Sequence, residues 1–130
     1  LDQGVIVVCA GGGGIPVMRR ADGSLIGVEA VIDKDAASAL LAAEVGADAL
    51  LMLTDVDGVY DHWGTPQQTR IEHMTTAEAR KRSYPAGSMG PKVEAATAFI
   101  SNGGKIAGIG KLHDALAILN AKAGTIVGRV

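Results

Sequence analysis

The chain has 130 residues, with 12 Lys and Arg against 14 Asp and Glu, which gives a formal net charge of −2 at pH 7. This near-neutral charge argues against a nucleic-acid-binding protein, and the 48% of hydrophobic residues argues against intrinsic disorder. No apolar run approaches the roughly 18 residues that span a bilayer. We therefore expect a soluble, cytoplasmic protein with no nucleic-acid or membrane partner, and the length predicts one domain over residues 1–130.

Cys9 is the only cysteine, so the chain can form no internal disulfide. It belongs to a continuous apolar run over residues 4–10, which predicts a buried strand of a parallel sheet covered on both faces. Cys9 is accordingly expected to be a small buried thiol. Asp22 and Gly23 then predict a hairpin turn between residues 17–20 and 24–28.

The middle of the chain alternates between helical and strand patterns. Residues 33–45 are expected to form a helix, with Asp33 as its N-cap and Gly46 at its end. Residues 47–53 predict a second buried strand, and residues 55–68 predict a polar loop.

Further along the chain, Thr75 and Glu78 have the spacing of a capping box that opens a short helix ending before Pro85. Residues 87–91 are expected to be a loop that leads into a helix up to Asn102. The remaining predictions are a strand at 105–109, a helix at 114–119 and a strand at 125–127. This alternation of strands and helices predicts an α/β fold with a layered sheet.

Three loops have features of an anion site. Four consecutive glycines at 11–14 follow the first predicted strand, and without Cβ atoms their N–H groups can turn toward an anion. Lys34 lies between Asp33 and Asp35 at a predicted helix N-terminus, which attracts phosphate. The glycines could equally form a flexible turn, and the charged residues could be a helix cap with a solvated lysine.

The third loop, residues 87–92, places Lys92 in the first turn of a helix. A cation opposes the helix dipole there, which suggests an anionic partner, although a tolerated surface lysine is the alternative. Residues 54–61 follow the second predicted strand and offer carboxylates, a hydroxyl and an aromatic ring. They could border a ribose or a purine, or form an ordinary Asp/Gly turn. The spacings of a P-loop, an EF-hand and a zinc site do not occur, so no metal ligands are predicted.

Four motifs together resemble the carbamate kinase family of the amino-acid kinase superfamily. They are AGGGGIPV at 10–17, GVEAVIDKDAA at 27–37, LTDVDGVY at 53–60 and GSMGPKVEAA at 87–96. The resemblance implies a three-layer αβα sandwich around a mainly parallel sheet. It also implies reversible phosphoryl transfer between ATP and carbamate, with ADP and carbamoyl phosphate as products, Mg²⁺ as cofactor and a homodimeric assembly.

The resemblance also implies roles for individual residues. Lys34 and Lys92 would contact phosphates, and Asp35 would organise these lysines. Residues near the nucleotide and the transferred phosphoryl group would be Gly11, Gly12, Gly13, Thr54, Asp55, Val56, Asp57, Tyr60, Met89 and Gly90.

The family carries a glycine-rich acceptor loop and a further catalytic lysine upstream of the matched motifs, whereas this chain begins at Leu1. We therefore expect the C-terminal, nucleotide-binding part of such an enzyme, which alone could be inactive. Two alternatives remain open. One is a nucleotide-binding module without turnover, and the other is a sister kinase that acts on acetylglutamate or uridylate.

Overall fold

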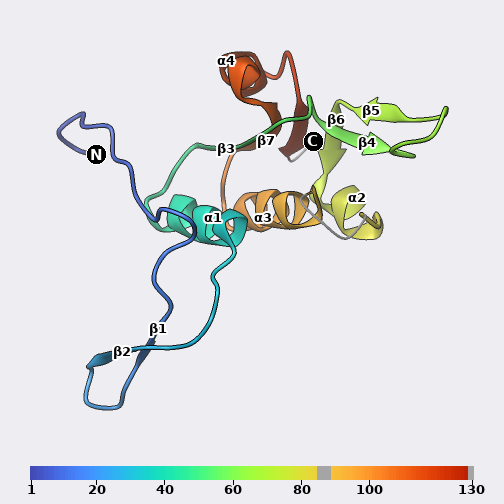
Figure 1. Cartoon of the computed structure of the whole chain (residues 1–130). Helices are drawn as coiled ribbons and strands as arrows, with labels where there is room; N and C mark the ends of the chain where they lie inside the picture. The colour runs from blue at the N-terminus through green and yellow to red at the C-terminus, as the bar shows by residue number, and fades with distance from the viewer. Residues whose placement is uncertain (85–88, 129–130) are drawn as a thin grey trace.

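The computed structural model describes residues 1–84 and 89–128 (Figure 1). No helix in these two ranges is both long enough and apolar enough to cross a membrane. In chain order the elements are β1 (Val17–Arg19), β2 (Leu25–Gly27), α1 (Lys34–Glu44), β3 (Ala49–Thr54), β4 (Val59–Asp61), β5 (Thr69–Ile71), β6 (His73–Thr75), α2 (Thr76–Lys81), α3 (Met89–Ser101), β7 (Ile106–Lys111), a 3₁₀ turn (Leu112–Asp114), α4 (Ala115–Leu119) and β8 (Thr125–Gly128).

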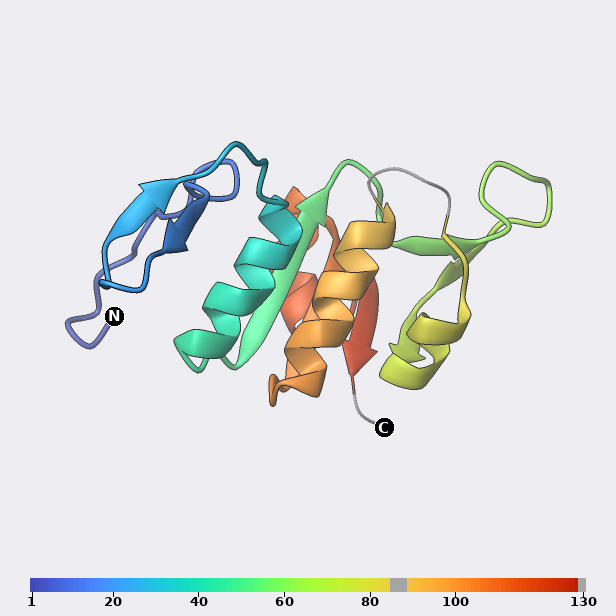
Figure 2. The same ribbon diagram turned by 90° about the horizontal axis from the view of Figure 1, so that it is seen from below.

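The central sheet has four strands in the order β3-β7-β8-β6. The β3–β7 and β6–β8 pairs are parallel, and the β7–β8 pair is antiparallel, so the sheet is mainly parallel as expected. Helices α1, α2 and α3 cover one face, and α4 covers the other (Figures 1 and 2). The structure thus has the predicted three layers.

Local sequence signals account for the helix ends. The Asp33 side chain accepts a hydrogen bond from the backbone N–H of Ala36 at 2.8 Å, so Asp33 is the N-cap of α1 as predicted. Gly46, with a φ of +64°, follows the end of this helix. The capping box of Thr75 and Glu78 is formed in both directions at the start of α2. These three predictions are confirmed.

The core lies mainly between α3 and the central sheet. Val93, Ala96, Phe99 and Ile100 on α3 are at most 1% exposed. On the other face, α4 lies directly on β7, because a Cβ on Gly108 would come within 2.3 Å of an Ile118 side-chain carbon. Packing of the buried face of α3 against the sheet therefore fixes the position of the helix N-terminus.

The prediction of a buried strand at residues 4–10 is wrong. This segment has no strand structure, Ile6 and Val8 are 93% and 97% exposed, and Cys9 is exposed. A strand needs a neighbour for its backbone hydrogen bonds, and the segment lies outside the four-stranded sheet, in which β3 is an edge strand. Continuous apolar character was therefore not sufficient to form a strand here.

Two predicted loops are also corrected. Residues 55–68 are not one polar loop, because β4 lies within them and pairs antiparallel with β5. Val59, which is fully buried, anchors β4 despite the surrounding Asp and Gly residues. Met89, Gly90 and Pro91 belong to α3 and not to a loop. Gly87 and Ser88 of that predicted loop lie outside the described residues.

Candidate active site

The elements that carry the predicted site residues meet at one edge of the central sheet. Strands β3 and β7 are parallel, with Thr54 paired to Lys111 at their carboxyl ends. Helices α1 and α3 lie side by side, and both begin at this same edge (Figure 2). Ligands of α/β sheets bind outside the carboxyl ends of parallel strands. The edge therefore combines the usual location of a ligand site with two helix N-termini.

A buried ion pair joins the two helix N-termini. The Nζ atom of Lys92 lies 2.9 Å from Oδ2 and 3.3 Å from Oδ1 of Asp35. The two residues are only 6% and 8% exposed. The carboxylate is favoured in the first turn of α1, and its charge offsets the unfavourable position of the lysine in the first turn of α3. The pair therefore holds one ammonium group in a defined place at the sheet edge.

Lys34 is the first residue of α1 and is exposed. Within residues 1–84 and 89–128 it forms no ion pair. The carboxylates on either side of it are engaged by other donors, Asp33 by the N–H of Ala36 and Asp35 by Lys92. The structure thus brings Asp35 together with Lys92, whereas Lys34, which precedes Asp35 in the same first turn of α1, is exposed to solvent.

The glycine run forms a turn that lies against the entry to α1. The N–H of Gly13 donates to the carbonyl oxygen of Ala10 at 2.9 Å. Gly13 has a φ of +144°, and a Cβ at this position would lie 2.5 Å from the carbonyl oxygen of Ile32. Cβ atoms on Gly11 and Gly12 would meet nothing within 4 Å. The close contact with the carbonyl oxygen of Ile32, two residues before Lys34, therefore requires glycine at position 13.

The segment after β3 is held by short polar contacts. The Thr54 hydroxyl donates to Asp55 at 3.0 Å, and the Tyr60 hydroxyl donates to Asp57 at 2.8 Å. The bond from Tyr60 is the main cause that lowers the pKa of Asp57, and the same bond raises the pKa of Tyr60. Val56, between these pairs, is half-buried. This turn, from Thr54 at the end of β3 to Tyr60 in β4, thus contains all five predicted residues and has two separate side-chain hydrogen bonds.

Three neighbours of this turn were not predicted. Arg70 lies with its Nη1 atom 3.7 Å from Asp57, and Arg82 forms an ion pair with Asp61. Thr125, which is fully buried, accepts from the N–H of Val59 at 2.7 Å and donates to the carbonyl oxygen of Ile71. No local motif marks these residues, because their partners come from distant parts of the chain.

Met89 and Gly90 open α3, three and two residues before Lys92. Met89 is partly buried and packs against the core. A Cβ on Gly90 would lie 3.8 Å from the Cβ of Tyr84, which is ordinary van der Waals contact. The start of α3 is thus fixed by the core on one side and by Tyr84 on another.

Known proteins are similar to this chain in sequence and in fold. The sequence model of the amino acid kinase family matches residues 1–109. A carbamate kinase of Rhizobium meliloti is 51% identical over 129 residues, which are 98% of this chain and 40% of that protein. The carbamate kinase of Escherichia coli K12 is 47% identical over 127 residues, which are 98% of this chain and 41% of that protein.

A solved structure agrees with these sequence matches. The carbamate kinase of Giardia lamblia bound to AMP-PNP superposes with a TM-score of 0.92 at 39% identity, and the match covers 99% of this chain and 46% of that one. The chain therefore spans about 40% of the length of the curated relatives it matches. Because the family model covers most of its residues, the chain belongs to the amino acid kinase family.

Proposed function

We propose that the chain is the nucleotide-binding portion of a carbamate kinase. That enzyme would transfer a phosphoryl group reversibly between ATP and carbamate, giving ADP and carbamoyl phosphate. The observation that carries the proposal is the buried Asp35–Lys92 pair, which places an ammonium group between two helix N-termini at the ligand-binding edge of the sheet. Carbamate kinases at about 50% identity support the choice of substrates.

The polyphosphate of ATP would bind where α1 and α3 begin. The first N–H groups of each helix have no partner within the helix, and the helix dipoles favour an anion there. Lys92 and Lys34 would each offer an ammonium group to the phosphates, with the charge of Lys92 partly balanced by Asp35. Attack of an anionic carbamate oxygen on the γ-phosphate is opposed by charge repulsion, so neutralisation and positioning supply most of the catalysis.

Asp35 would act through Lys92 as a positioning residue. Both of its carboxylate oxygens face the Lys92 ammonium, so the lysine side chain keeps one orientation before the nucleotide arrives. An ammonium group that is already oriented requires no reorganisation when charge moves to the leaving ADP.

The rest of the nucleotide would follow the edge of the sheet. The turn from Thr54 to Tyr60 would border the ribose and adenine, and Val56 and Tyr60 would offer apolar surface. The first turn of α3, with Met89 and Gly90, would lie along the phosphates. The glycine turn at Gly11, Gly12 and Gly13 would lie near the transferred phosphoryl group, because Gly13 contacts the entry to α1.

Mg²⁺ would enter the site bound to the nucleotide. The phosphate oxygens of ATP are its preferred hard ligands, and both oxygens of Asp35 are already engaged by Lys92. When bound, Mg²⁺ would neutralise part of the phosphate charge. The two lysines would then balance the negative charge that remains.

A chimera tests the proposal. This chain replaces the matching part of the Rhizobium meliloti enzyme, and ADP formation is followed with carbamate, acetylglutamate or uridylate as acceptor. We expect ADP formation that depends on carbamate. ADP binding without turnover on any acceptor would favour a binding module, and turnover on another acceptor would favour a sister kinase.

Lys92→Ala in the same chimera tests the central residue. We expect kcat to fall by about 100-fold or more, whereas the Kd for ADP, which is dominated by the nucleoside contacts, changes much less. Lys105→Ala is the matched control, because Lys105 pairs with Asp48 on the exposed surface. An unchanged kcat for Lys92→Ala would refute the role of the lysine.

A further inference from the structure

An ion pair fixes the end of the β4 strand. Asp61 is the last residue of β4, and its carboxylate accepts a hydrogen bond from Arg82, which follows α2. The two side chains are 44% and 32% exposed, so the pair is half-buried. It connects two parts of the chain that are 21 residues apart. Asp61 ends the segment 54–61 that the sequence singles out, but neither Asp61 nor Arg82 lies in the four motifs that resemble the carbamate kinase family.

The β4–β5 hairpin is small and depends on contacts with the rest of the fold. Its two strands have three residues each and form a separate two-stranded sheet. A hairpin of this size is marginally stable by itself. Within the described residues, β4 is anchored at Val59 by the Thr125 hydroxyl and at Asp61 by Arg82. Tyr60 lies between these two anchored residues.

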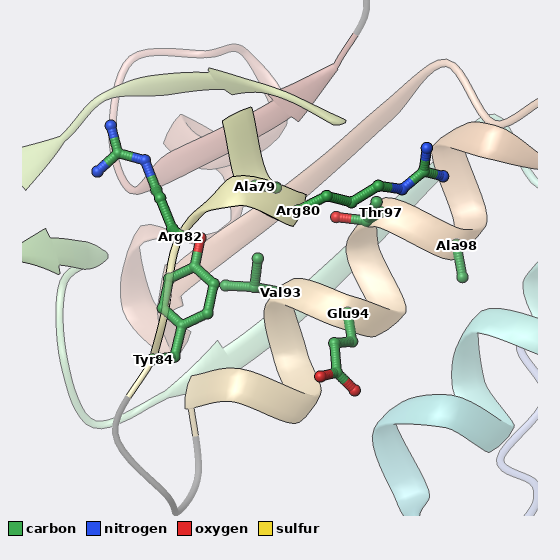
Figure 3. A pocket seen from close by; sticks show the side chains of 8 residues that line it. All are labelled: Ala79, Arg80, Arg82, Tyr84, Val93, Glu94, Thr97 and Ala98. Atoms are coloured by element: carbon green, nitrogen blue, oxygen red, sulfur yellow. The ribbon is translucent and has the colours of Figure 1, made fainter. Parts of the chain in front are cut away.

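Arg82 is itself on a well-supported segment. Two residues further on, the Tyr84 hydroxyl donates to the sulfur of Met74 at 3.7 Å. Tyr84 also lies against the start of α3 at Gly90. Figure 3 shows Arg82 and Tyr84 at one end of a surface pocket, with Arg80 pointing away from them at the other end. The backbone segment that carries Arg82 is thus held through Tyr84, and the Arg82 guanidinium links this segment to the end of β4.

We propose that the Asp61–Arg82 pair positions Tyr60 for contact with the nucleoside, and so sets nucleotide affinity and not the rate of phosphoryl transfer. This inference rests on the proposed function, in which Tyr60 borders the nucleoside. Without the pair, the end of β4 is held only by its pairing with β5 and by the Tyr60–Asp57 hydrogen bond, so the Tyr60 ring spends less time in its binding position. Lys92 and Asp35 lie on other elements, so their arrangement is retained.

The chain contains a natural reporter for this effect. Trp63 is the only tryptophan, and its ring centroid lies 5.2 Å from that of Tyr60. ADP is titrated into the 130-residue chain while Trp63 fluorescence is recorded. The variants are Arg82→Met, Arg82→Lys and the charge swap Asp61→Arg with Arg82→Asp. Arg80→Met is the matched control, since Arg80 bonds only the Ser101 hydroxyl among the described side chains.

We expect Arg82→Met to raise the Kd for ADP by about three- to tenfold, which corresponds to the loss of one half-buried ion pair. Arg82→Lys and the charge swap should restore the Kd to within about twofold of the parent chain, because each retains an ion pair at this place. Arg80→Met should bind ADP as the parent chain does. In the chimera, Arg82→Met should raise KM for ATP and leave kcat nearly unchanged.

The outcomes separate the two proposals. If the parent chain and the chimera bind no ADP, the proposed function fails, and the inference fails with it. If both bind ADP and Arg82→Met binds it equally well, only the inference is overturned. A charge swap that stays folded by circular dichroism but does not restore the affinity for ADP also overturns the inference. The same holds if Arg82→Met in the chimera lowers kcat by the same factor by which it raises KM for ATP.

Discussion

The ammonium of Lys92 donates to both carboxylate oxygens of Asp35, although the two residues are 57 positions apart in the chain. The contact ties the first turn of α1 to the first turn of α3. Both side chains are nearly excluded from solvent, with exposed fractions of 7% and 11%. A buried charge that loses its partner is strongly unfavourable. Loss of either partner would therefore destabilise the fold, and the pair is also part of the proposed site.

Asp35→Asn should lower the free energy of unfolding by about 3–5 kcal/mol, because it leaves a buried ammonium without its counter-charge. The double variant Asp35→Asn with Lys92→Met should lose much less, since no unpaired charge remains. Urea denaturation followed by circular dichroism measures both. The exposed pair Asp48–Lys105 is the control, and its removal should change stability little. If the losses in free energy of unfolding measured for Asp35→Asn and Lys92→Met singly added up to the loss in the double variant, the two residues would not be coupled.

Gly13→Ala should disrupt the turn that precedes α1. Its Cβ would come 2.5 Å from the carbonyl oxygen of Ile32, and its φ of +144° is unfavourable for alanine. Gly12→Ala should be tolerated, since a Cβ there meets no atom within 4 Å. Amide hydrogen exchange provides the measurement: the Gly13 variant should lose protection at the hydrogen bond between this residue and Ala10. Equal protection in the two variants would show that the close contact is unimportant.

The hydrogen bond between Tyr60 and Asp57 should make stability depend on pH at both ends of the range. The lowered pKa of Asp57 means that its contribution is present above the unfolded value of about 3.9 and is lost as the pH falls through the lower folded value. The raised pKa of Tyr60 means that its contribution is present below about 10 and is lost as the pH rises through the higher folded value.

Tyr60→Phe removes the donor and should weaken both pH dependences. Thermal unfolding between pH 2.5 and 11 measures this effect. Tyr84→Phe is the control for the acidic side only, because Tyr84 does not contact Asp57 but burial raises the pKa of its own hydroxyl. The effect on the acidic side should be small, since the Asp57 side chain is 40% exposed and partly screened by solvent. A Tyr60→Phe profile identical to that of the parent chain would show that the hydrogen bond contributes nothing.

Thr125→Val should destabilise the hairpin and the sheet together. Its hydroxyl is fully buried and bonds both the N–H of Val59 and the carbonyl oxygen of Ile71. Two buried backbone groups lose their hydrogen-bond partner while the side-chain volume stays the same. Each unsatisfied group lowers the free energy of unfolding by about 1–3 kcal/mol. Thr69→Val, at an exposed position, is the control. Urea denaturation that gives the same midpoint for both variants would contradict this account.

Local signals predicted the helical parts of the fold well. Asp33 and Gly46 mark the ends of α1, and Thr75 with Glu78 marks the start of α2, because capping depends on residues within one helical turn. Strands were harder to predict. The apolar run at residues 4–10 resembles a strand but has no neighbour in the sheet, whereas β4 is a strand within a segment rich in Asp and Gly.

The candidate site was predicted as separate motifs. Lys34 and Lys92 are predicted as phosphate contacts because lysines at helix N-termini suggest an anionic partner, and Asp35 follows from the family resemblance; the turn after β3 is predicted from its polar groups. The resemblance implies that Asp35 organises both lysines, whereas among the described residues it pairs with Lys92 and not with Lys34. Which lysine it meets depends on how α1 packs against α3, and these helices are separated in the chain by β3, the hairpin and α2. Arg70, Arg82 and Thr125 were missed for the same reason.

The sequence by itself determined the ends of α1, the start of α2, the α/β class and the motifs shared with the amino acid kinase family, since these depend on neighbouring residues. Only the tertiary structure decided which charges meet and which strands find a partner. Ion pairs and sheet hydrogen bonds join residues that are distant in the chain, and their geometry is set when α1 and α3 pack against the sheet.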